Sequence, residues 1–192
     1  GTAGNGLSGG STSFMVSNTD WYTIYAVDNV GNETVKQIYV TVDTTPPSMT
    51  FSPCSASWTN RNITVTMTPY DSQTGVNYFQ YRTTANSGAS WSGWSGNITG
   101  GASGTVTLSN QGVYNIQTYE VDNAGNAGFA NSGWYYIDKT PPTCAASASS
   151  NDWRTGASPV TLTYSDDASG VATKQYSWSQ SASNPGSWQS YT

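Results

Sequence analysis

Acidic side chains recur at two kinds of place in this chain, and their oxygens are suited to binding a metal ion. An aspartate begins each of the related segments Asp28-Asn-Val-Gly-Asn32 and Asp122-Asn-Ala-Gly-Asn126. An aspartate also begins each of the segments Asp43-Thr-Thr-Pro-Pro47 and Asp138-Lys-Thr-Pro-Pro142. Carboxylate and amide oxygens are ligands that Ca²⁺ accepts. The candidate calcium ligands are therefore Asp28, Asp43, Asp122 and Asp138. The density of carboxylates is low, and the first two segments are also typical of a hairpin turn capped by its aspartate, so no cofactor is firmly predicted.

Aromatic side chains form a second group with binding chemistry, because they make up 13% of the chain. Trp91, Trp94 and Trp188 lie in segments rich in glycine and serine, where an exposed indole ring can stack on a sugar. The alternative is that these rings belong to the core or to an interface between modules. Carbohydrate binding is therefore kept as an alternative function.

Composition excludes several other kinds of chemistry. The chain has 192 residues and no histidine, and only 9% of its residues are charged. Catalytic sites that need histidine are thereby excluded, and the neighbouring acids Asp166 and Asp167 lie in a predicted turn rather than across a cleft. We expect no enzymatic activity. The six basic residues are scattered, so no nucleic-acid partner is expected, and no apolar run of about 18 residues predicts a membrane span.

These groups are positioned by an internal repeat of about 95 residues. The segment Tyr25–Asn32 recurs 94 positions later as Tyr119–Asn126, and the segment Asp43–Pro47 recurs 95 positions later as Asp138–Pro142. A tryptophan follows the paired prolines by 11 residues in both copies, at positions 58 and 153, and precedes an alternating apolar segment. Such a length suits one small β-sandwich.

The repeat divides the chain into three parts. Residues 47–140 form the one complete module, residues 1–46 the second half of a module (strands E, F and G), and residues 141–192 the first half of another (strands A, B and C). Placed end to end, the two halves make one module to within a residue. The sequence therefore predicts an all-β fold with its modules in a permuted frame: half, complete, half. The predicted strands cover residues 11–17, 21–28, 33–43, 48–51, 63–68, 76–83, 105–108, 113–122, 128–138, 159–165 and 171–179.

The repeated motifs resemble those of bacterial immunoglobulin-like repeat domains in large secreted surface proteins and adhesins. The motifs are Tyr-x-Val-Asp-x-x-Gly-Asn, a strand that ends before Asp-x-Thr-Pro-Pro, and a tryptophan before an alternating strand. This resemblance implies tandem immunoglobulin-like β-sandwiches and an extracellular or cell-surface location. One departure is Glu120, which stands where the other copy has Ala26.

The segments between modules are expected to be stiff. Pro46 and Pro47 in the first linker, and Pro141 and Pro142 in the second, fix φ and prevent a strand ladder from continuing. Cys54 and Cys144 occupy different places in the repeat. If strand A of the sandwich ends at the pole where strand G leaves, these two cysteines lie on either side of the second linker, which predicts an inter-domain disulfide. The alternative is two small buried residues.

Three functions follow from this organisation. The first is a structural repeat unit of an extracellular fibre, filament or surface stalk that serves adhesion, because neither half-module can bury a sandwich core alone. Its partners would be copies of the chain, joined head to tail by completion of split modules, or flanking repeats of one longer polypeptide. The second is a carbohydrate- or protein-binding adhesin module. The third is an accessory domain of a secreted enzyme. We adopt the first and expect the chain to be a processed product or an excerpt.

Overall fold

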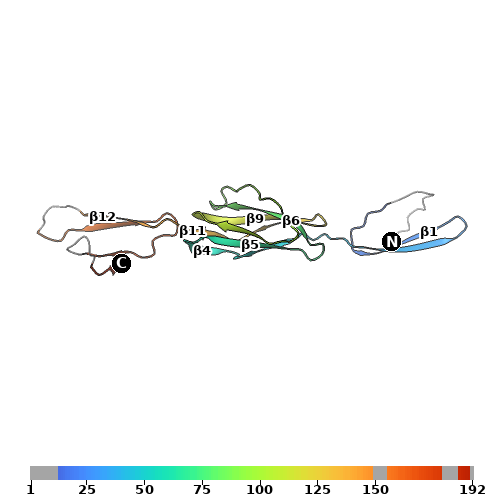
Figure 1. Ribbon diagram of the computed structural model, residues 1–192, viewed down its shortest axis with the longest axis horizontal. Coiled ribbons are helices and arrows are strands. Elements are labelled where there is room, and N and C mark those ends of the chain that lie inside the picture. The colour runs from blue at the N-terminus through green and yellow to red at the C-terminus, as the bar shows by residue number, and fades with distance from the viewer. Residues whose placement is uncertain (1–12, 149–154, 179–185, 191–192) are drawn as a thin grey trace.

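A computed structural model describes residues 13–148, 155–178 and 186–190 of this protein, and these residues are all-β. Fifteen strands form five sheets, with no helix among the described residues. The strands gather into three bodies that follow one another along the long axis of the molecule (Figure 1). The described part of the chain accordingly contains no helix long and apolar enough to cross a membrane.

The N-terminal body is a β-hairpin. Strands β1 (Asp20–Val27) and β2 (Glu33–Val40) pair antiparallel, from Asp20 opposite Val40 to Val27 opposite Glu33. The carboxylate of Asp28 closes the turn because it accepts bonds from the backbone N–H groups of Val30 and Asn32, both at 2.9 Å. Gly31 takes a φ of +91°, which a residue without Cβ adopts freely.

The central module is built from two sheets. One has the order β3-β5-β8, and the other has the order β4-β11-β9-β6-β7, with β10 also paired to β9. The bounds are β3 (Ser48–Ser52), β4 (Ala56–Thr59), β5 (Ile63–Tyr70), β6 (Val76–Thr84), β7 (Ile98–Thr99), β8 (Gly104–Leu108), β9 (Gly112–Asp122), β10 (Ala127–Asn131) and β11 (Tyr135–Ile137).

The hydrophobic core lies inside this central module. On β5 the residues alternate between buried and exposed, so that Ile63, Val65 and Met67 face inward while the threonines between them face outward or lie at the sheet surface. They pack against inward residues of the other strands: Phe79, Leu108, Tyr114, Ile116, Tyr135 and Ile137. The central module is thus the part of the described chain that buries a core of its own.

The C-terminal body has two separate hairpins. Strand β12 (Thr143–Ala148) pairs with β13 (Val160–Ser165), and β14 (Gln175–Tyr176) pairs with β15 (Gln189–Ser190). Among the described residues, β14 has no partner on its other edge.

The end bodies repeat strand registers of the central module. In β9 and β10, Val121 lies opposite Ala127, and 94 positions earlier Val27 lies opposite Glu33 in the N-terminal hairpin. In β3 and β5, Ser48 lies opposite Tyr70, and 95 positions later Thr143 lies opposite Ser165. The hairpin β1–β2 therefore corresponds to β9–β10, and β12–β13 corresponds to β3–β5.

The predicted strands of the central module are confirmed except at its last strand. The segment predicted over 128–138 is interrupted at Ser132, whose side chain accepts a bond from the Ile116 N–H at 2.9 Å, so it forms β10 and β11. Strand β4 was missed because Ala56–Thr59 carries no alternation. The strand predicted over 11–17 is wrong for residues 13–17, and β14 is shorter than predicted. Trp153 and residues 11, 12 and 179 lie outside the described residues.

Candidate functional site: the two module joints

The first joint is held by the side chain and carbonyl of Asp43. Its carboxylate accepts a bond from the Thr74 hydroxyl at 2.6 Å and one from the Thr45 N–H at 2.9 Å. Its backbone carbonyl accepts a bond from the Asn126 side chain at 3.0 Å. The linker residue is thus tied to two separate turns of the central module. The bonds to its carboxylate, first from Thr74 and then from Thr45, lower the pKa of Asp43.

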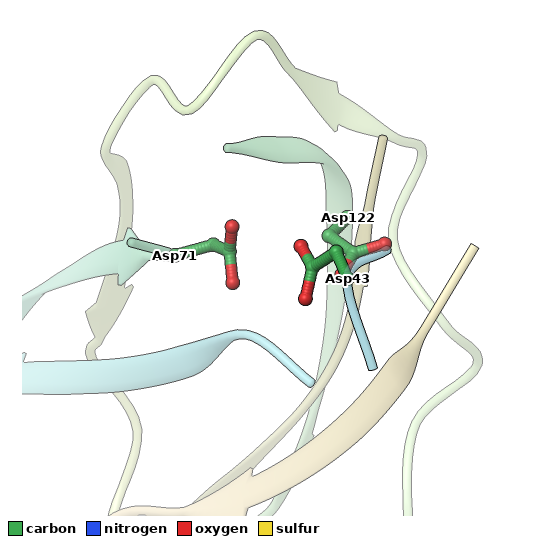
Figure 2. A group of neighbouring side chains, drawn as sticks. All are labelled: Asp43, Asp71 and Asp122. Carbon is green, nitrogen blue, oxygen red and sulfur yellow. The ribbon is translucent and has the colours of Figure 1, made fainter. Parts of the chain in front are cut away.

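Two further carboxylates approach Asp43 at this joint. Asp71 follows β5 and accepts bonds from the N–H groups of Gln73, Thr74 and Gly75. Asp122 ends β9 and is almost fully buried. One carboxylate oxygen from each of Asp43, Asp71 and Asp122 lies within 4.8 Å of the other two. In Figure 2 the side chains of Asp71 and Asp43 face each other, and Asp122 lies beside Asp43.

This three-carboxylate cluster has the donor chemistry of a calcium site. Ca²⁺ takes about six to eight oxygen ligands, and carboxylates are among those it prefers. Two of the four aspartates named from the sequence, Asp43 and Asp122, meet in the cluster. Asp71 was missed, because its role depends on a turn that brings β5 beside the linker.

The second joint repeats the arrangement with one carboxylate fewer. Asp138 accepts bonds from the N–H groups of Thr140 and Ser169, both at 3.0 Å. Ser169 is the repeat counterpart of Thr74, and its bonds lower the pKa of Asp138. Asp166, the counterpart of Asp71, accepts bonds from Ala168 and Gly170. The paired prolines lie in segments without strand pairing at both joints: Pro46, Pro47, Pro141 and Pro142.

The counterpart of the third carboxylate lies at the other end of the chain. Asp28 stands 94 positions before Asp122 and accepts the same bonds within its turn. The Asn32 side chain donates to Asp28 at 2.7 Å, and the Asn126 side chain donates to Asp122 at 2.8 Å. Hydrogen bonds to Asn32 and Val30 lower the pKa of Asp28. The sequence motif therefore predicted the conformation of the Asp28 turn. It did not reveal that this turn lies in the N-terminal body, away from the second joint.

The end bodies expose the apolar residues that the central module buries. Val65 on β5 is fully buried, whereas Val160, its counterpart 95 positions later, is 59% exposed. On β9 the position of Thr118 is fully buried, whereas Ile24, its counterpart 94 positions earlier on β1, is 43% exposed. The described residues place no second sheet against this face of β1–β2. Against β13 they place only the short pair β14–β15, whose Gln175 carbonyl accepts a bond from the Tyr164 hydroxyl at 3.3 Å.

Trp91 and Trp94 form a ladder with Arg82 on the surface of the central module. The guanidinium carbon of Arg82 lies 5.0 Å from the centre of the Trp91 ring and 4.7 Å from that of Trp94. The Arg82 side chain also donates two bonds to Oε1 of Gln117, at 2.8 and 2.6 Å. The guanidinium thus lies over a face of both indoles.

Ser92 and Ser95, each directly after one of these tryptophans, cover the edge of β6. The Ser92 and Ser95 N–H groups donate to the carbonyls of Thr83 and Tyr81, both at 2.8 Å. Their hydroxyls accept bonds from the N–H groups of the same two strand residues at 3.0 Å. The segment therefore supplies the partners that an unpaired strand edge lacks.

Beside this ladder lies an exposed aromatic cluster that the sequence did not indicate. The Phe129 ring on β10 lies 4.8 Å from the ring of Tyr119 and 6.4 Å from that of Trp94. Phe129 is 67% exposed and Trp94 is 39% exposed. Trp188, at 63% exposed, lies in the C-terminal body. The strand pairing of β9 with β10 brings the cluster together, which residue spacing alone did not reveal.

The predicted disulfide between Cys54 and Cys144 is absent from the structure, where both thiols are free and exposed. The expectation placed Cys54 at the pole next to the second joint. Instead β4 follows Cys54 and runs parallel to β11, toward the joint, so that Thr59 bonds the Asp138 N–H. Cys144 takes the register position of Met49, which packs on the central core.

No protein-family model matches the chain, and the comparison with curated proteins gives no match either.

Proposed function

We propose that this protein is a structural repeat unit of an extracellular fibre, filament or surface stalk that serves adhesion. Its modules are immunoglobulin-like sandwiches in a permuted frame, with halves at 1–46 and 141–192 and a complete module at 47–140. The halves complete one another head to tail, either between copies of the chain or along a longer tandem array. Its role is mechanical rather than enzymatic.

The observation that carries this proposal is the contrast between matched residues. Val65 is fully buried and Val160 is 59% exposed, although Val160 stands 95 positions after Val65, the offset that relates the strand pair β12–β13 to β3–β5. A sheet face with exposed valine and isoleucine is stabilised by covering it, at about 25 cal/mol per Å² of apolar surface. In the central module β3 and β5 belong to one sheet and β9 and β10 to the other. Their counterparts β1 and β2 are therefore the strands expected to cover β12 and β13.

A hydrogen bond at the start of β9 supports the immunoglobulin-like assignment. The Tyr114 hydroxyl donates to the carbonyl of Asn110 at 3.0 Å, and the Tyr22 hydroxyl donates to that of Asn18 at 2.8 Å. A tyrosine that bonds back to the chain just before strand F is typical of immunoglobulin-like sandwiches, where it is called the tyrosine corner. The motif is present in the complete module and in the N-terminal half.

The joints support an extended rather than a folded-back arrangement. Asp43 ties the first linker to the turn after β5, at Thr74, and Asp138 ties the second linker to the turn after β13, at Ser169. Paired prolines follow both aspartates, and they fix φ in the linker. Modules joined in this way make a rod.

The decisive experiment is a concentration series of the isolated chain in analytical ultracentrifugation, with electron microscopy of the products. Head-to-tail completion predicts species that grow in length with concentration, because each copy has one half-module of each kind. A chain that stays monomeric at every concentration would overturn the proposal.

A matched pair of variants distinguishes head-to-tail completion of the half-modules from lateral association through the aromatic cluster of the complete module. Val160→Asp places a charge on the open face of β13 and is expected to suppress elongation. Phe129→Asp places the same charge on a similarly exposed apolar residue of the complete module and is expected to leave elongation unchanged. Loss of elongation in the second variant alone would assign the contacts to the lateral aromatic cluster instead.

The aromatic cluster favours carbohydrate binding as a second candidate function. Trp94, Tyr119 and Phe129 lie side by side and partly exposed, which is the kind of surface on which sugars stack. This function predicts glycan binding that Phe129→Ala abolishes. Glycan arrays on which the chain and this variant give the same signal would exclude it.

A further inference from the structure

The second joint contains a cleft of about 370 Å³. The linker Asp138–Pro142 lines it together with Asp166, Ser169 and Gly170 of the C-terminal body and Trp58 of the central module. The two aspartates in its lining, Asp138 and Asp166, are the repeat counterparts of Asp43 and Asp71.

At the first joint, the corresponding surface is covered by the turn between β9 and β10. Asn123 in this turn donates from its backbone N–H to the carbonyl of Gly75 at 3.0 Å, and from its side chain to the carbonyl of Thr74 at 2.8 Å. Gly75 is the counterpart of Gly170, and both take a positive φ, +75° and +84°. The central module therefore shows what kind of segment fits against such a joint.

This chain contains a second turn of the same sequence and conformation. Asp28-Asn-Val-Gly-Asn32 differs from Asp122-Asn-Ala-Gly-Asn126 at one residue. Its aspartate accepts the same set of bonds, and its glycine takes a φ of +91° against +94°. Asn29, the counterpart of Asn123, is exposed in the N-terminal body.

We propose that the turn Asp28–Asn32 of a second copy binds in the cleft at the second joint and that β1 of that copy pairs with β14. This inference rests on the proposed function and specifies its contact. Asn29 of the second copy then donates to the carbonyls of Ser169 and Gly170. Asp28 of the second copy takes the place beside Asp138 and Asp166 that Asp122 takes beside Asp43 and Asp71.

The central module fixes the register of this pairing. Gln80 on β6 lies opposite Tyr119 on β9, and their repeat counterparts are Gln175 and Tyr25. Gln175 of one copy is therefore expected opposite Tyr25 of the next. A shift of one residue would turn the inward side chains of β1 outward, so the pairing is specific.

The first test compares two asparagines that are equivalent in the repeat. Asn29→Ala removes a side-chain hydrogen bond that forms only between copies, and it is expected to weaken association about fivefold to tenfold in sedimentation equilibrium. The unfolding temperature of the central module stays unchanged. Asn123→Ala is the matched control, because it removes the bond within one chain: it lowers that unfolding temperature and leaves association unchanged. Equal effects of both variants on association would overturn the inference.

The second test reads the register directly by disulfide cross-linking between two populations of full-length chains in which Cys54 and Cys144 are replaced by serine. One population carries Tyr25→Cys and the other Gln175→Cys, and oxidation is expected to link them, since directly opposite strand residues lie within the Cα separation of about 4.4–6.8 Å that a disulfide needs. Ser177→Cys in place of Gln175→Cys is the control, because it lies on the same face but diagonally, at about 7–8 Å.

The outcomes separate this inference from the proposed function. Linkage of position 25 to position 175 in preference to 177 supports the inference. Elongation without that preference overturns the register while the proposed function stands. Absence of any association overturns both.

Discussion

At the scale of single residues, Glu120 is the least accommodated group in the described chain. Its side chain is 1% exposed, and neither carboxylate oxygen has a hydrogen-bond partner. The counterpart residue in the N-terminal body is Ala26, so this carboxylate is not required by the module as such. Burial raises the pKa of Glu120, because the charged form loses its hydration.

Glu120→Gln is expected to stabilise the central module at neutral pH by about 1–2 kcal/mol, because it removes a desolvated charge. A carboxylate whose pKa is higher in the folded state binds more protons when folded, so its contribution to stability falls as pH rises above the ordinary value of 4.5. The difference in unfolding free energy between the variant and the wild-type protein should therefore increase with pH from about 4.5 upward. Urea unfolding across this range measures it, and a constant difference would contradict the assignment.

At the scale of elements, the ladder of Trp91, Arg82 and Trp94 replaces a strand at the edge of β6. The Arg82 guanidinium is planar and donates twice to Gln117 while it stacks on both rings. Lysine carries the same charge but neither the fork nor the flat face.

Arg82→Lys is expected to lower the unfolding free energy of the central module by about 1–2 kcal/mol and to change the fluorescence of the stacked tryptophans. The control is Arg61→Lys, because Arg61 is exposed in the turn before β5. Chemical unfolding monitored by tryptophan fluorescence measures both variants. Equal stabilities would show that the ladder contributes through its serine bonds alone.

The same scale explains why the cysteine prediction was wrong. The predicted position of Cys54 assumed that strand A ends at the pole of the module. The chain adds β4 after Cys54, which carries it along β11 to the joint at Thr59 and Asp138. Pairing of a short parallel strand depends on its neighbour in space, and residues Ala56–Thr59 have no pattern that predicts it.

At the scale of the whole molecule, the two joints set how far the protein extends. Pro46 and Pro47 follow Asp43, whose carboxylate accepts a hydrogen bond from the Thr74 hydroxyl. Replacing both prolines with glycine frees φ in the linker and leaves the hydrogen bonds from Thr74 and Asn126 to Asp43, and from Gln73 to Thr45, as restraints.

The variant Pro46→Gly/Pro47→Gly is expected to show a broader distribution of distances between spin labels placed in the N-terminal body and in the central module, by double electron–electron resonance. Adding Thr74→Val, which removes the hydroxyl donor, is expected to broaden it further. A distribution as narrow as that of the wild-type protein in both variants would show that the joint is stiffened by other contacts.

The sequence by itself determined the repeat, the all-β class and the turns, because these depend on local conformation. Alternation of apolar and polar residues predicts a half-buried strand wherever it occurs, and Asp-Asn-x-Gly-Asn specifies its own turn through bonds between neighbours. Most predicted strands of the central module and the hairpin of the N-terminal body were found for this reason.

Only the tertiary structure decided which of these elements meet. It brought Asp71 to Asp43 and Asp122, gathered Phe129 beside Tyr119 and Trp94, and placed β4 between Cys54 and the second joint. It also placed two equivalent valines in different surroundings: Val65 is buried beneath a second sheet, whereas Val160 is exposed. Contacts between distant strands depend on the closure of long loops and on the presence of a partner sheet, and neither is encoded in the spacing of neighbouring residues.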